Sequence, residues 1–219
     1  DESLSARPMA RVMDPLKEMG AKFSPDGRDR LPLTLTCRSD LQALSYAPRQ
    51  ASAQVKSTIL LAGLNAQGTT EVTELRATRD HTERMLRSFG AEVTVRAGSG
   101  TQNIVSLKGG QPLHAVETII PGDPSSAAFL IAGAVISRSG GVVVENIMSN
   151  ETRDGFFQAI ARMGAGLGAE EIGDGAGERL IDLQAATSPL KGCEVPETLV
   201  ASMIDEFPIL AVVAAFAKG

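Results

Sequence analysis

Hydrophobic positions along the chain follow two kinds of helical spacing that alternate. In the first kind, apolar residues recur every three or four positions, as at Met9, Val12 and Leu16, with polar residues between them. The same spacing recurs at about residues 80–89 and 153–163. All three stretches end in Met or Phe followed by Gly-Ala, and the glycines are Gly20, Gly90 and Gly164. Because glycine readily adopts the left-handed conformation after the last turn of a helix, we predict three amphipathic helices ending there.

The second kind of helix is apolar around most of its circumference. It covers residues 53–66, 125–137 and 206–218, and a glycine follows each stretch within three residues. Helices of this composition are predicted to be buried on most sides. The first two lead into strands rich in β-branched residues, at 69–73 and 142–144.

Alternating apolar and polar residues on either side of glycine-rich turns predict two β-hairpins. One joins residues 92–96 to 103–107, and the other joins 168–172 to 180–183. The repeating unit is therefore strand, apolar helix, strand, amphipathic helix and hairpin, with a period of about 72 residues. This order predicts an α/β (α+β) fold built from repeated βαβαββ units.

The repeat is expected to be incomplete in this chain. The sequence begins with an amphipathic helix whose apolar partner helix does not precede it, and it stops where a strand is due. The alternative is a natural protein with incomplete terminal repeats. Pro and Gly interrupt the pattern at Ile120-Pro121-Gly122, which predicts two domains. Residues 1–120 would hold one partial and one complete unit, and residues 121–219 one complete unit and the start of another.

Composition argues against several classes of protein. The 219 residues carry 21 Lys and Arg against 26 Asp and Glu, a formal charge of −5, which argues against a nucleic-acid-coating surface. The longest apolar stretches, 127–136 and 207–217, are shorter than the roughly 20 residues that cross a bilayer, so no membrane association is expected. The two cysteines, Cys37 and Cys193, are too few for a disulfide framework or a zinc site. We expect a cytoplasmic protein without a metal.

Charged and hydroxyl residues stand at several predicted helix starts. Arg7 precedes the first amphipathic helix, Ser52 the first apolar one and Arg79 the second amphipathic one. Helix N-termini bind anions through free N–H groups, so these residues are candidate phosphate or carboxylate ligands. Each also has a purely structural interpretation. Arg7 would be a solvated cation and Ser52 a helix cap, and the same ambiguity applies to Arg79.

Three further acidic features occupy helix starts. Asp80 and Glu83 are spaced like a capping pair. Asp123, in a Gly-Asp-Pro-Ser-Ser segment, is interpreted mainly as a turn and cap. Asp205 and Glu206 open an otherwise apolar helix, where an N-cap aspartate would explain one of them without a catalytic role.

Four segments, in this order and at this spacing, resemble the 5-enolpyruvylshikimate-3-phosphate synthase family across essentially the whole chain. They are Ser52-Ala53-Gln54-Val55-Lys56-Ser57, Arg79-Asp80-His81-Thr82-Glu83, Gly122-Asp123-Pro124-Ser125-Ser126-Ala127-Ala128 and Ile204-Asp205-Glu206-Phe207-Pro208-Ile209-Leu210-Ala211. Arg7-Pro8-Met9, which precedes these four segments, also resembles the family. The residues of the motifs are similar to those of the bacterial glyphosate-tolerant subtype. The family has two domains, each assembled from three βαβαββ units, in agreement with the repeat.

The resemblance implies an activity and a set of roles. The reaction would transfer the enolpyruvyl group from phosphoenolpyruvate to the 5-hydroxyl of shikimate 3-phosphate, releasing phosphate, in aromatic amino-acid biosynthesis. Shikimate 3-phosphate would be bound by Ser52, Ala53, Gln54 and Arg79, with Ser52 and Arg79 on its phosphate and Gln54 between the two substrates. Arg7 would bind phosphoenolpyruvate, and Asp205 would be the base. No metal or organic cofactor is implied.

The chain also departs from the family pattern. It lacks the N-terminal Lys-Ser segment and its Arg, the Gly-rich loop before Arg7, and the C-terminal Lys-Glu-Ser stretch with two further arginines. We therefore expect the isolated chain to be inactive and to self-associate, whereas full-length members would be monomeric. The alternatives are a non-catalytic fragment, one piece of a split enzyme, or the sister transferase acting on UDP-N-acetylglucosamine. That sister family uses a Cys-Gly loop, whose context neither Cys37 nor Cys193 has.

Overall fold

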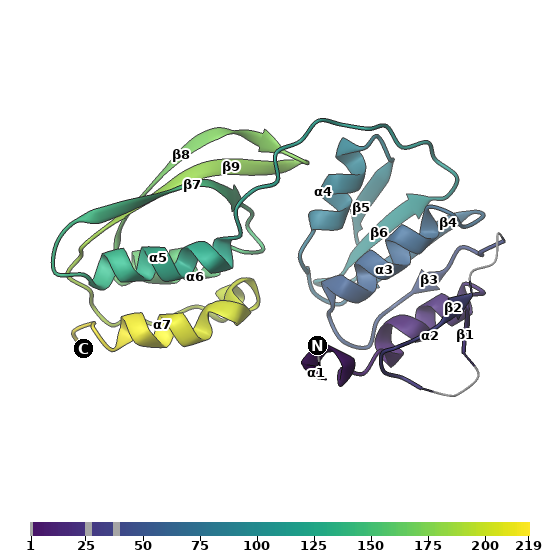
Figure 1. Cartoon of the computed structure of the whole chain (residues 1–219), viewed down its shortest axis with the longest axis horizontal. Helices are drawn as coiled ribbons and strands as arrows, with labels where there is room; N and C mark the ends of the chain where they lie inside the picture. The colour runs from purple at the N-terminus through teal and green to yellow at the C-terminus, as the bar shows by residue number, and fades with distance from the viewer. Residues whose placement is uncertain (1, 25–27, 37–39) are drawn as a thin grey trace. The chain divides into compact units, whose positions relative to one another are not determined.

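The computed structural model describes residues 2–24, 28–36 and 40–219, and the chain divides into two compact units (Figure 1). Unit 1 is Asp1–Ala115 and unit 2 is Val116–Gly219. This division and the one expected after residue 120 both fall in a stretch without helix or strand, residues 111–121. Among the described residues, no helix has the length and apolar character needed to cross a bilayer.

Unit 1 contains one complete βαβαββ unit. Its four strands form a sheet in the order β3-β4-β6-β5, with β3 parallel to β4 and the other neighbours antiparallel. The elements are β3 (Ser45–Tyr46), α3 (Ala53–Gly63), β4 (Thr69–Glu74), α4 (His81–Ser88), β5 (Val93–Ala97) and β6 (Asn103–Lys108). A helix–hairpin group precedes them: α1 (Glu2–Ser5), α2 (Ala10–Glu18), β1 (Lys22–Phe23) and β2 (Leu35–Thr36).

The core of unit 1 lies between this sheet and its helices. Alternate residues of β4 are buried, and they are Thr70, Val72 and Glu74. Ile59 and Leu60 of α3 pack into the same cluster and are fully buried. The inward face of β4 therefore carries one charged residue, Glu74, at its end.

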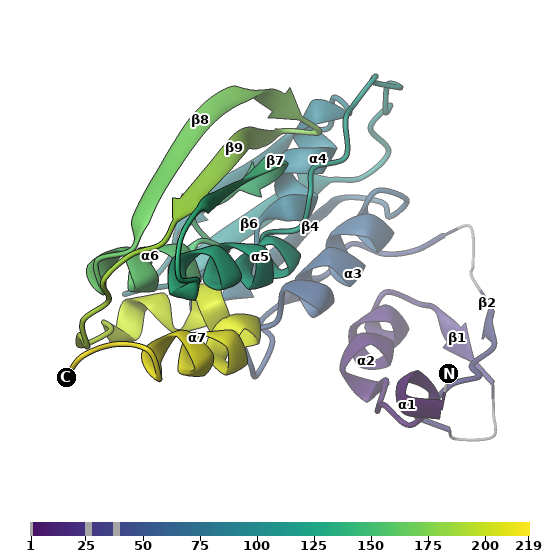
Figure 2. The same ribbon diagram turned by 60° about the vertical axis from the view of Figure 1, so that its left-hand side comes forward.

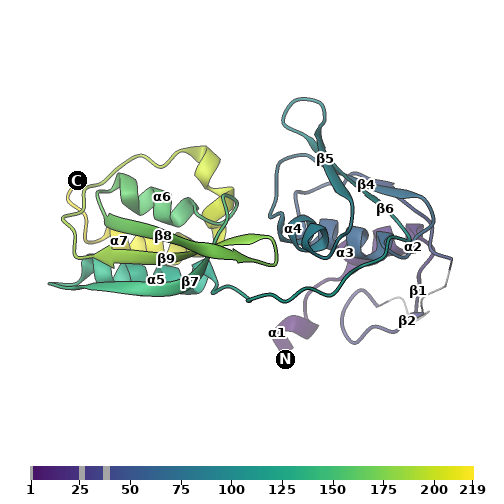
Figure 3. The same ribbon diagram turned by 90° about the horizontal axis from the view of Figure 1, so that it is seen from above.

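Unit 2 repeats the same order of elements. Its three-stranded sheet, β7-β9-β8, is antiparallel (Figure 3). The first strand of the unit is reduced to a parallel bridge between Gly122 and Ile147. The elements are α5 (Pro124–Ile136), β7 (Gly141–Ser149), α6 (Gly155–Arg162), β8 (Gly166–Gly175) and β9 (Glu178–Ala186), followed by the 3-10 helices η1 (Glu197–Leu199) and η2 (Ala201–Glu206) and by α7 (Phe207–Ala214). The hairpins and apolar helices predicted from the sequence are confirmed.

The glycines that end the three amphipathic helices have the predicted conformation. Gly20, Gly90 and Gly164 have φ angles of 102°, 90° and 93°, in the region where a side chain is strained. The chain thus leaves α2, α4 and α6 in the same way. The periodic Gly-Ala sequence signal reflects one recurring helix ending.

The prediction that all three apolar helices are buried on most sides is wrong for α7. In α7 only Val213 is buried, whereas Phe207 and Val212 are 40% and 45% exposed. α5 lies between the sheet and α7 and is buried on most sides as predicted, with Phe129 and Leu130 on its one exposed face (Figure 1, Figure 2). An apolar sequence indicates that a helix favours burial, but burial also requires a neighbour on every side.

Candidate functional site

The start of α3 presents three of the candidate residues. Ser52 is the N-cap of this helix, and its Oγ accepts a hydrogen bond from the Val55 amide at 3.4 Å. This contact confirms the capping interpretation and leaves the hydroxyl beside the free N–H groups of the first turn. Ala53 and Gln54 form that turn, and the Gln54 side chain accepts a hydrogen bond from Arg11 of α2 at 2.7 Å.

Arg79 lies in the loop between β4 and α4, one residue before the N-cap position Asp80. Two contacts join the start of α4 to α3. The hydroxyls of Ser57 and Thr82 are 2.6 Å apart, and the Lys56 ammonium lies 2.6 Å from a carboxylate oxygen of Glu83. The structure therefore brings together the two helix starts that carry Ser52 and Arg79.

Asp80 and Glu83 do not form the predicted capping pair. Asp80 makes no side-chain cap hydrogen bond, and its carboxylate accepts one from Arg84 Nε at 2.8 Å. Glu83 is buried and pairs with Lys56. A buried cation binds a carboxylate more strongly than a neutral backbone amide does, so the Lys56 charge decides where Glu83 points.

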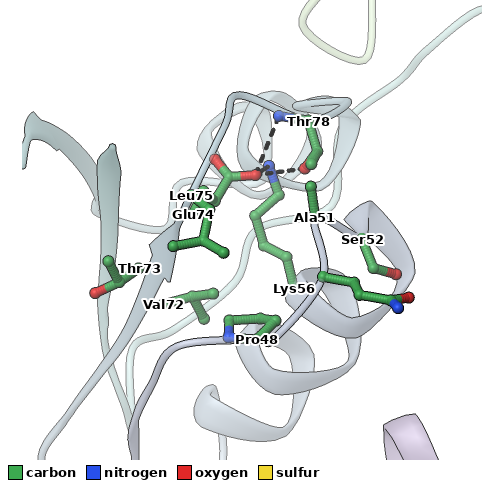
Figure 4. A pocket seen from close by; sticks show the side chains of 10 residues that line it. Pro48, Ala51, Ser52, Lys56, Val72, Thr73, Glu74, Leu75 and Thr78 are labelled. Carbon is green, nitrogen blue, oxygen red and sulfur yellow. Dashed lines mark hydrogen bonds and ion pairs between the residues drawn. The ribbon is translucent and has the colours of Figure 1, made fainter. Parts of the chain in front are cut away.

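Lys56 is a site residue whose role the sequence analysis missed. Its ammonium also lies 3.0 Å from Glu74, and a cavity of about 10 Å³ beside it is lined by Ser52 and Thr78, among others (Figure 4). The available signal was the single charged residue of a helix predicted to be buried on most sides. Its partners follow it by 18 and 27 positions, so no local pattern points to them.

Arg7 lies between α1 and α2, two residues before the N-cap position Met9, and it is exposed. Its backbone amide donates to the Leu4 carbonyl at 3.2 Å. The neighbouring Ala6 carbonyl accepts a hydrogen bond from the Arg30 guanidinium. This position ahead of a helix start is the one predicted.

In unit 2, Asp123 is the N-cap of α5, as predicted. Its carboxylate accepts hydrogen bonds from the Ser126 amide at 3.0 Å and from Arg153 at 2.9 Å. Burial raises the pKa of Asp123, but the Ser126 hydrogen bonds and the Arg153 charge outweigh it, so the net pKa lies below the ordinary value. Arg153 precedes the N-cap of α6 as Arg79 precedes that of α4, and here the anion beside it is a residue of the protein.

Asp205 lies near the end of η2 and is exposed. It is not the N-cap of α7, so the capping interpretation is wrong at this position. Glu206 occupies the N-cap, without a side-chain cap hydrogen bond, and its buried carboxylate accepts a hydrogen bond from Ser125 of α5. That contact ties the Asp205 segment to the start of α5. Asp205 belongs to unit 2, and the other five candidates belong to unit 1.

The two cysteines take no part in this arrangement as far as the structure describes it. Cys193 is a free, exposed thiol, and Cys37 lies outside the described residues.

Comparison with known sequences identifies the family. A family model described as EPSP synthase (3-phosphoshikimate 1-carboxyvinyltransferase) matches residues 1–219. The 3-phosphoshikimate 1-carboxyvinyltransferases of Hyphomonas neptunium and Caulobacter vibrioides are similar to this chain, at 59% and 51% identity. Each alignment covers 100% of this chain and 50% of the relative, so the chain spans about half the length of the curated relatives it matches.

Solved structures agree with this assignment. The EPSP synthase of Acinetobacter baumannii is 44% identical, with a TM-score of 0.87, over 100% of this chain and 48% of that chain. The enolpyruvyl transferase NikO of Streptomyces tendae has a TM-score of 0.69 at 20% identity, over 99% of this chain and 51% of that chain, which shows a shared fold. Because the family model covers its whole length and the solved relatives share its fold, this chain belongs to the EPSP synthase family.

Proposed function

We propose that this chain is part of an enzyme that transfers the enolpyruvyl group of phosphoenolpyruvate to the 5-hydroxyl of shikimate 3-phosphate and releases phosphate. The observation that carries the proposal is the joining of two helix starts by the Ser57–Thr82 and Lys56–Glu83 contacts. These helix starts carry Ser52 and Arg79, the residues that the family resemblance assigns to the substrate phosphate. Family membership over residues 1–219 supports the same reaction.

The phosphate of shikimate 3-phosphate would bind at the start of α3. The free N–H groups of the first turn and the Ser52 hydroxyl supply hydrogen bonds, and Arg79 supplies a planar guanidinium that matches phosphate oxygens. Ala53 lets the substrate approach the backbone closely. Gln54, oriented by Arg11, would lie between the two substrates.

Phosphoenolpyruvate would be bound in part by Arg7, and Asp205 would act as the base on the attacking 5-hydroxyl. Addition of this hydroxyl to the enol carbon requires removal of the hydroxyl proton, and an exposed carboxylate is suited to accept it. In the same addition the methylene carbon of phosphoenolpyruvate takes up a proton and becomes a methyl group. Elimination of phosphate together with one proton of that methyl group then forms the new enol ether. Glyphosate is the proposed inhibitor, and no cofactor is needed for these steps.

The chain spans about half of its curated relatives, so we propose that it binds shikimate 3-phosphate weakly and does not turn over alone. Transition-state stabilisation depends on several groups that act as a unit, and loss of members of such a unit is far from additive. Phosphate release assayed on the purified, mass-verified chain checks this, with a full-length relative as the positive control. Turnover by the isolated chain would contradict it.

Binding by isothermal titration calorimetry tests the phosphate site itself. Because a charge-assisted hydrogen bond contributes about 1.5–3 kcal/mol, Arg79→Ala is expected to weaken shikimate 3-phosphate binding roughly ten- to a hundredfold. Arg76→Ala is the matched control, because Arg76 is an exposed arginine of the same loop. Equal affinity of the Arg79→Ala variant and the wild type would refute the assignment.

A further inference from the structure

Three buried charges meet at one point in unit 1. The Lys56 ammonium lies 3.0 Å from Glu74 and 2.6 Å from Glu83, and the three side chains are 1%, 7% and 2% exposed. We call these residues the buried triad. They come from three elements: the fourth residue of α3, the last residue of β4 and the third residue of α4.

The buried triad extends directly to the loop that carries Arg79. Glu74 Oε1 accepts a hydrogen bond from the Thr78 amide at 3.2 Å and another from the Thr78 hydroxyl (Figure 4). Thr78 precedes Arg79 in the chain. The backbone at Arg79 is therefore linked through Thr78 and Glu74 to Lys56, one helical turn beyond Ser52.

The fold itself does not require these charges. Unit 2 builds the same strand–helix–strand–helix order with apolar residues at the matched helix positions, Ala127 as the fourth residue of α5 and Phe157 as the third of α6. Burying ions carries a desolvation penalty, and apolar replacements of buried ion pairs are often neutral or stabilising. Stability alone therefore gives a weak reason for a charged triad at this place.

Direct attraction of the substrate does not explain the triad either. With all three groups ionised, one positive and two negative charges give a formal charge of −1, which repels a phosphate. The Lys56 ammonium already lies within 3.0 Å of two carboxylates. What the triad supplies is geometry, because it joins the helix start at Ser52, the loop at Arg79 and the first turn of α4.

We propose that Lys56, Glu74 and Glu83 are positioning residues that hold the Arg79 loop against the start of α3, so that Arg79 and Ser52 bind one phosphate group together. This inference rests on the proposed function, because the phosphate is that of shikimate 3-phosphate. None of the three residues touches the substrate. They order the loop before the substrate binds, so binding does not have to include the entropic cost of ordering it.

The test compares Glu74→Leu with the wild-type 219-residue chain. This substitution removes the acceptor for Thr78 and leaves Lys56 paired with Glu83. If only the charge of the triad mattered, shikimate 3-phosphate would bind more tightly, because a negative charge is lost. If the triad positions the loop, the substrate should bind more weakly, by about tenfold or more. Calorimetry gives the affinity, and amide hydrogen exchange of Thr78 by NMR reports on the anchor itself.

Matched variants separate positioning from folding. Glu71→Leu makes the same change on the same strand, where Glu71 pairs with Arg96 and Ser106, and it should leave affinity and Thr78 exchange unchanged. Glu74→Gln keeps a carbonyl oxygen for Thr78 and should retain most of the affinity. Thr78→Val leaves the triad intact and removes one donor, so it tests the anchor without burying an unpaired charge.

The outcomes distinguish this inference from the proposed function. Faster Thr78 exchange together with weaker binding in Glu74→Leu, and partial weakening in Thr78→Val, support it. Unchanged affinity in Glu74→Leu, unchanged Thr78 exchange, or a loss of affinity that matches only the unfolded fraction overturns it while the proposed function stands. Absence of shikimate 3-phosphate binding by the wild type overturns both.

Discussion

Two adjacent glycines after β6 should respond differently to the same substitution. A Cβ on Gly109 would lie 1.9 Å from the Ala66 carbonyl oxygen and 2.7 Å from that of Gly63, and both are backbone atoms that cannot rotate away. The Gly109 amide also donates to the Gly68 carbonyl at 2.9 Å. Gly109→Ala must therefore separate the end of α3 from β6.

At Gly110 the reason for glycine is conformational. No atom lies within 4 Å of a Cβ built there, but φ is +73°, which strains any L-residue. We expect Gly110→Ala to cost about 1–2 kcal/mol. Gly109→Ala should cost about 3 kcal/mol or more, the upper end for overpacking, because the clash is between backbone segments.

Urea unfolding followed by tyrosine fluorescence measures both changes. The chain has one tyrosine, Tyr46 of β3, and no tryptophan, so this signal reports on unit 1. In thermal unfolding, the Tm of the Gly109→Ala variant should lie about 12 °C or more below that of the wild type. An equal effect at the two positions, or a larger one for Gly110→Ala, would refute the steric argument.

Two further predictions concern unit 2. Asp123 has a lowered pKa when folded, so its ionised form stabilises unit 2 above the unfolded pKa of about 4, and this contribution is lost as the pH falls through the folded pKa. Asparagine is also a good N-cap, so the difference in unfolding free energy between wild type and Asp123→Asn should be present at pH 6 and shrink as the pH falls below about 4. A difference that does not change with pH would contradict this. Phe156 is fully buried, and Phe156→Ala should cost about 3–5 kcal/mol. Hydrogen exchange should locate the loss in unit 2 without moving the Tyr46 transition, and a shift of that transition would argue against independent units.

Much of the fold follows from local sequence because helix and strand periods and turn glycines act over a few residues. The helix endings at Gly20, Gly90 and Gly164, the two hairpins and the Asp123 cap all depend on contacts within one turn or one hairpin. The repeat made these signals stronger, because the same pattern recurs with a period near 72 residues. The starts of α3 and α4, which carry Ser52 and Arg79, could be placed for the same reason.

Tertiary structure decided which groups meet. Glu83 was free to cap α4, but folding places it beside Lys56, 27 residues earlier in the chain, and Asp123 pairs with Arg153 across 30 residues. The exposure of α7 likewise depends on which elements pack around it. Residue spacing determines the face of an element on which a side chain lies. Its partner depends on how distant elements pack, since a charge buried on folding pairs with whatever opposite charge the fold brings within reach.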